Sequence, residues 1–152
     1  MYDIFVYLFE NCRQADLAQN NDLIVRKLSA AGFDDTDISE ALSWLAGVVR
    51  TPHRCAARCP EPARAFRVYA PKECAKLDAA SRGLIMHLEA IGVLDPGLRE
   101  LVIDRAMAAA GRALSIHQVR LIVLMVLWNL ETPASRLMAE ELLAPTQDRL
   151  AN

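Results

Sequence analysis

The sequence lacks the features that identify most enzymes, membrane proteins and exported proteins. It has only six glycines, and they form neither a phosphate-binding loop nor a dinucleotide-binding motif. Its longest apolar run, from Leu121 to Trp128, is far shorter than the roughly 20 residues of a membrane-spanning helix. An acidic residue, Asp3, stands where a signal peptide would be basic, and no small-residue cleavage pattern follows. We therefore expect no membrane association and no export.

Groupings typical of active sites are missing too. His87 and His117 fall in predicted helices without a serine or cysteine partner nearby in the sequence. The segment Ser81-Arg82-Gly83 lacks the flanking glycines of a nucleophile elbow. We therefore predict no catalytic residue, no enzymatic activity and no cofactor.

A strong excess of charge of one sign is also missing. Charged residues make up 24% of the chain and give a net charge of −2, unlike a dedicated nucleic-acid-binding protein. The hydrophobic share of 53% is ample for a folded core and argues against a disordered chain. Four cysteines in a chain without an export signal indicate reduced thiols, so we expect a cytoplasmic protein.

Apolar side chains recur three and four residues apart along most of the chain, which predicts a mainly α fold. Three helices are expected within residues 1–50, at about 4–12, 23–31 and 38–49. Gly32 would end the second helix, because glycine readily adopts the left-handed conformation found at helix C-termini. The second and third helices would together resemble a helix-turn-helix.

That resemblance does not extend to the chemistry of DNA binding. A helix that reads DNA presents Arg, Lys, Asn or Gln to the bases and phosphates. The third predicted helix presents carboxylates instead, which the phosphates would repel: Asp34, Asp35, Asp37 and Glu40. The same acidic face could dock on a basic protein.

Residues 51–71 interrupt the helical pattern. Four of the seven prolines lie there, so a continuous helix is excluded. The alternation of apolar and charged residues from Phe66 to Tyr69 predicts one short strand or extended arm. We therefore predict three units: a three-helix N-terminal subunit at 1–50, a proline-rich basic arm with a short strand at 51–71, and a C-terminal helical bundle at 72–152.

Signals for helix starts recur in the C-terminal part. Asp95 precedes a proline, and Ser115 and Gln118 have the spacing of a capping box. The helix that Ser115 opens is apolar on nearly every face through Leu130, so we expect other helices to surround it. A last amphipathic helix is expected from Thr132. A structural ion-pair cluster between two helices is also expected, formed by Glu89, Glu100, Asp104 and Arg105.

Charge is distributed unevenly along the chain. Residues 1–50 carry eight acidic and four basic side chains, whereas residues 51–82 carry three acidic and seven basic ones. Arginines beside exposed aromatic rings can grip phosphates and stack on bases. The alternative, which we favour, is a solvated arm or one docked on the acidic helices. The candidate nucleic-acid-binding residues are Arg54, Arg58, Arg64, Arg67, Tyr69 and Lys72.

A candidate metal site lies in and beside the same arm. His53, Cys55, Cys59 and Cys74 could supply the four nitrogen and sulfur ligands that zinc prefers. Only one close cysteine pair is present, whereas strong zinc signatures have two. Free thiols are therefore the favoured interpretation, and a reversible Cys55–Cys59 disulfide is a further alternative. Cys12 and Cys74 fall in predicted helices and are interpreted as small core residues.

Several dispersed blocks of sequence resemble the Smg family of small bacterial proteins over nearly the whole chain. The family has no established activity, cofactor or catalytic residue, so the resemblance implies none here. The His and Cys residues of 51–65 depart from the family pattern, so a metal role there would not be a family property. The blocks include Tyr7-Leu8-Phe9-Glu10, Ala31-Gly32-Phe33, Arg67, Tyr69, Pro71, Glu73-Cys74, Arg82-Gly83, Val102-Ile103-Asp104-Arg105 and Leu124-Met125-Val126-Leu127.

Together these patterns predict a non-enzymatic protein-interaction or scaffold protein whose partner is another protein. The first alternative is a nucleic-acid-associated, winged-helix-like protein that binds through residues 51–82. The second is a zinc-stabilised interaction module. The sequence does not specify an oligomeric state.

Overall fold

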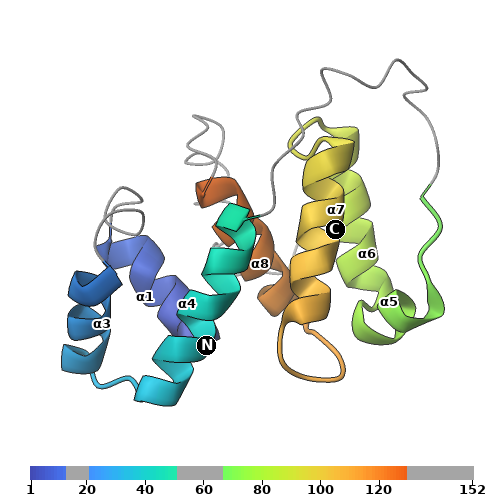
Figure 1. Ribbon diagram of the computed structural model, residues 1–152. Coiled ribbons are helices and arrows are strands. Elements are labelled where there is room, and N and C mark those ends of the chain that lie inside the picture. Colours follow the sequence, from blue (N-terminus) through green and yellow to red (C-terminus); the bar gives the residue numbers. More distant parts are fainter. Residues whose placement is uncertain (13–20, 51–66, 130–152) are drawn as a thin grey trace, which may run out of the picture.

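The computed structural model describes residues 1–12, 21–50 and 67–129 of the 152-residue chain (Figure 1). These ranges contain seven helices and no strand, which confirms the mainly α fold. The helices are α1 (Tyr2–Asn11), α3 (Asn21–Ala30), α4 (Asp35–Arg50), α5 (Pro71–Lys76), α6 (Ala79–Ala90), α7 (Pro96–Ala108) and α8 (Ile116–Trp128).

The N-terminal helices pack as the apolar spacing predicts. α4 contacts both α1 and α3, and Ile24 and Leu28 of α3 are fully buried with Ile38 of α4. Gly32 follows the end of α3 with a φ of +91°, in the left-handed region where residues with a Cβ are strained. The structure thereby confirms the three expected N-terminal helices and the end of the second one at Gly32.

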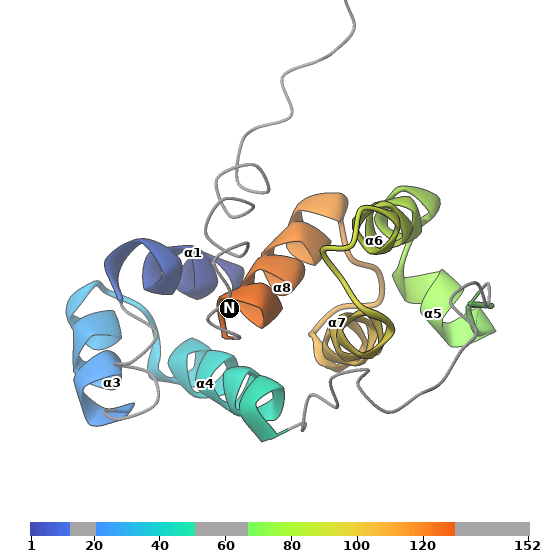
Figure 2. The same ribbon diagram turned by 90° about the horizontal axis from the view of Figure 1, so that it is seen from above.

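Helix α8 lies at the centre of the molecule. Ser115 and Gln118 form the predicted capping box: Gln118 N donates to Ser115 Oγ (3.3 Å), and Ser115 N donates to Gln118 Oε1 (2.9 Å). Every residue from Ile122 to Leu127 is buried. α8 contacts α1, α6 and α7, and Figure 2 shows it between the N-terminal helices and α5–α7. One hydrophobic core therefore extends through both halves of the chain.

The remaining helices form one side of this core. Asp95 caps α7, since its Oδ1 accepts a hydrogen bond from Leu98 N (2.8 Å), as the sequence predicts. α7 contacts α4, α5, α6 and α8. An isolated parallel bridge between Leu77 and Leu114 joins the end of α5 to the residue before the cap of α8.

The strand predicted at residues 66–69 is not found where the structure describes the chain. Residues 67–70 belong to neither a helix nor a strand, and Phe66 lies outside the described residues. A strand needs a neighbouring strand to satisfy its backbone groups. Here Ala70 N donates instead to the Glu73 carboxylate (2.8 Å), which starts α5. The helix expected from Thr132 also lies outside the described residues.

None of the helices within the described ranges is long and apolar enough to span a bilayer.

Candidate functional site

A network of five charged side chains holds residues 67–70 against the helices. Arg67 donates to both oxygens of Glu73 on α5 (2.8 and 2.8 Å) and to both oxygens of Glu100 on α7 (2.7 and 2.9 Å). Arg99 donates to Glu100 (2.9 Å) and to Glu89 of α6 (2.6 Å). We call these residues the Arg67 network. The network links α5, α6 and α7. Both contacts of Arg67 are bidentate, and bidentate arginine–carboxylate pairs are stronger than single ion pairs.

Hydrogen bonding within the Arg67 network changes the acidity of its members. The bonds from Arg67 hold the pKa of Glu73 at about 2, below the usual 4.5 of a glutamate. Burial would raise the pKa of Glu100, but hydrogen bonds from Arg67 and Arg99 outweigh it and lower that pKa. The bonds to Glu73 and Glu100 raise the pKa of Arg67. Arg67, Glu73 and Glu100 are therefore charged at neutral pH.

The Tyr69 ring packs against two arginines, one of them Arg67 of the network. The guanidinium carbon of Arg67 lies 4.8 Å from the ring centroid and that of Arg82 lies 5.8 Å from it. The tyrosine hydroxyl is buried, and no described residue hydrogen-bonds to it. Burial raises the pKa of Tyr69. The ring is thus part of the packing of this segment on α5–α7.

The candidate nucleic-acid-binding residues are placed only in part. Arg54, Arg58 and Arg64 lie outside the described residues. Arg67 contacts two carboxylates, and Lys72 is exposed on α5. The binding of nucleic acid by this arm stays a prediction.

The candidate metal ligands are also placed only in part, because His53, Cys55 and Cys59 lie outside the described residues. Within the ranges that the structure does cover, no group of three or more His, Cys, Asp or Glu residues could hold a metal ion. Cys12 is buried, as expected, but Cys74 is exposed, and the prediction that it is a core residue is wrong. Residues Lys76 and Leu77 are the buried ones at this helix, and Cys74 Sγ accepts a hydrogen bond from Arg82 (3.0 Å) instead.

The predicted ion-pair cluster has a different membership from the one expected. Glu89 and Glu100 are joined, but through Arg99 rather than Arg105. Arg105 pairs with its neighbour Asp104, at 2.6 Å. Sequence reasoning also overlooked Glu73, although its place in the first turn after Pro71 is typical of a carboxylate that caps a helix.

Lys76 is one of the seven basic residues of 51–82, but its burial was not predicted from the sequence. Its ammonium group donates to the backbone oxygens of Met107 (2.9 Å) and Ala109 at the end of α7. A cation there complements the negative end of the helix dipole and satisfies carbonyl groups that have no partner within the helix. No local sequence signal identifies this contact, since it joins residues more than 30 positions apart.

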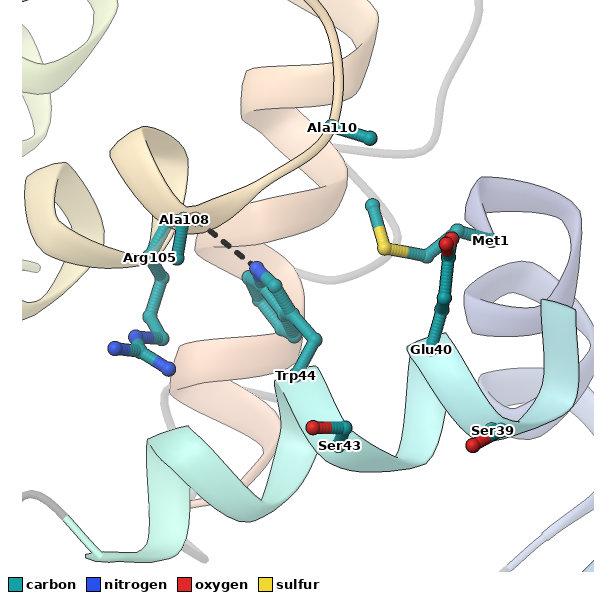
Figure 3. A pocket seen from close by; sticks show the side chains of 8 residues that line it. All are labelled: Met1, Ser39, Glu40, Ser43, Trp44, Arg105, Ala108 and Ala110. Carbon is teal, nitrogen blue, oxygen red and sulfur yellow. Dashed lines mark hydrogen bonds between the residues drawn. The ribbon is translucent and has the colours of Figure 1, made fainter. Parts of the chain in front are cut away.

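A groove of about 500 Å³ lies between α4 and the end of α7 (Figure 3). Trp44 and Arg105 meet there, because Trp44 Nε1 donates to the backbone oxygen of Arg105 (3.0 Å). Glu40 stands beside Met1 at the other end, and Ser39, Glu40 and Ser43 are exposed along α4. The lining residues are Met1, Ser39, Glu40, Ser43, Trp44, Arg105, Ala108 and Ala110.

Comparison with known proteins gives full-length matches. The family model described as "Protein of unknown function (DUF494)" matches residues 1–152. The protein Smg homolog of Aromatoleum aromaticum is 45% identical over 99% of this chain and 97% of its own length. The protein Smg homolog of Azoarcus sp. is 45% identical over 97% and 96%, and that of Bordetella avium 44% over 98% and 98%. No solved structure gives a significant match. The chain therefore belongs to the DUF494 family, in which its relatives carry the name Smg, as the dispersed sequence blocks predicted.

Proposed function

We propose that this protein is a non-enzymatic interaction protein that binds another protein through the exposed surfaces of its helices. The observation that carries the proposal is the acidic N-terminal end of α4. Its carboxylates are all exposed to solvent: Asp34, Asp35, Asp37 and Glu40. A concentration of like charge at a surface attracts partners of opposite charge and repels nucleic acid.

The arrangement of the other charged groups supports the same function. In the Arg67 network, arginines and carboxylates satisfy one another between helices, and Lys76 caps α7. Groups held in this way stabilise packing and are poorly placed to bind or activate a substrate. The acidic end of α4 is different, because Asp37 has only a 3.7 Å contact with the amino group of Met1 and remains 56% exposed.

The proposal is tested by affinity capture of the native protein from cell extract, with quantitative mass spectrometry and with or without nuclease. We expect the same protein partners in both samples. Loss of all partners after nuclease treatment would support the nucleic-acid alternative instead. Turnover in an unbiased substrate screen, abolished by one polar substitution, would overturn the non-enzymatic assignment.

A further inference from the structure

The groove between α4 and α7 is lined by two charged residues, Glu40 and Arg105, and otherwise by apolar and hydroxyl side chains. Glu40 is exposed, and no described residue forms an ion pair with it. The other charged residue of the lining, Arg105, is 16% exposed and donates through Nε and Nη2 to Asp104 (3.0 and 2.6 Å). Because Arg105 is neutralised and Glu40 is not, the groove offers a negative charge to a ligand.

The side chains between these ends are held firmly. Trp44 is only 6% exposed, and its indole is fixed by the hydrogen bond to Arg105 O (3.0 Å). Met1 has a side chain only 8% exposed, and Ala108 and Ala110 complete an apolar wall. A long aliphatic side chain could lie along this wall with its polar end at Glu40, as Lys and Arg side chains do on other apolar surfaces.

The charge around the groove decides which occupant fits. Asp37 lies one turn before Glu40 on α4, and Asp34 and Asp35 precede it at the start of the helix. Four carboxylates outnumber the amino group of Met1, which lies 3.7 Å from Asp37, so this end repels phosphates and attracts cations. We propose that the groove is the docking site for a basic segment of a partner protein, with a Lys or Arg side chain paired with Glu40. This inference rests on the proposed function and names the surface and the chemistry of the partner.

A short labelled peptide of alternating lysine and alanine, flanked by glycine, is a suitable probe, with fluorescence anisotropy as the readout. Glu40→Lys reverses the charge that the proposal requires, and Ser43→Trp fills the groove without changing charge. We expect each to weaken binding at least about tenfold. Glu10→Lys and Ser29→Trp make the same changes at exposed positions outside the groove lining, and we expect less than about a twofold effect.

Circular dichroism and the urea midpoint would establish that all four variants fold like the natural protein. The proposal is wrong if the peptide shows no saturable binding, if Ser43→Trp binds it as tightly as the natural protein, or if Glu40→Lys and Glu10→Lys weaken it equally. Affinity capture distinguishes failure of the groove proposal from failure of the proposed interaction function. Nuclease-resistant partners that are still recovered with Ser43→Trp would overturn the groove and leave the interaction function standing, whereas capture without any protein partner would contradict both.

Discussion

The backbone oxygen of Arg105 accepts a hydrogen bond from the indole of Trp44, and this 3.0 Å contact joins α4 to the last turns of α7. The guanidinium of Arg105 lies against α4 as well. A Cβ added to Gly47 would be only 1.7 Å from its Nη1. The absence of a side chain at Gly47 therefore allows the guanidinium of Arg105 to lie this close to α4.

The first prediction concerns this close approach. Alanine inside a helix is more stable than glycine by about 0.5–1 kcal/mol. We expect Gly47→Ala to give that gain in an Arg105→Ala background and to give little gain or a loss when Arg105 is present, because its guanidinium must move. Urea unfolding of the two single variants and the double variant measures the coupling. Equal effects of Gly47→Ala in both backgrounds would contradict the contact.

The second prediction concerns Lys76. Replacing it with methionine keeps the apolar stem but leaves the carbonyls of Met107 and Ala109 without their ammonium donor. We expect a loss of about 1–3 kcal/mol in the free energy of unfolding. Lys72→Met, on the exposed side of the same helix, is the matched control and should change stability by less than about 0.5 kcal/mol. Similar values for both variants would show that the cap contributes nothing.

The third prediction is a pH dependence that comes from Glu73. The pKa of Glu73 in the folded protein is about 2, below the usual 4.5 of a glutamate, so the unfolded chain takes up this proton first as the pH falls. The stabilisation is therefore complete above about pH 5 and is lost as the pH falls toward the folded-state pKa. The Glu73→Gln variant lacks this pH-dependent stabilisation, because its side chain does not ionise. We expect its stability deficit, from urea unfolding, to shrink between neutral pH and about pH 3. A deficit that stays constant over this range would argue against the ion pair with Arg67.

The fourth prediction separates the nucleic-acid alternative from the proposed function. That alternative requires salt-sensitive binding that weakens when Arg58 and Arg64 are both changed to Glu. Arg67 is left unchanged, because reversing its charge would break the contacts with Glu73 and Glu100. A loss of binding could then not be distinguished from a loss of folding. We expect no difference between the natural protein and the double variant in electrophoretic mobility shifts with single- or double-stranded DNA and RNA. A clear loss of binding in the variant would favour the alternative.

Local patterns predicted the helices well where the structure describes them. Gly32 ends α3, and Asp95 and Ser115 cap α7 and α8, because each of these signals acts on backbone groups only a few residues away. Of the two alternatives predicted for residues 66–69, a strand or an extended arm, the strand is wrong for the described residues 67–69. Alternation of side chains describes one segment, whereas a strand also requires a neighbour.

The sequence by itself determined the mainly α fold, the helix ends and the burial of α8, since apolar periodicity and capping depend on nearby residues. Only the tertiary structure decided which charges meet. Arg67 pairs with Glu100, Lys76 reaches the end of α7, and Trp44 bonds to Arg105, each across 31 to 61 positions of sequence. Such contacts depend on how the helices pack together, so the spacing of residues along the chain carries no sign of them.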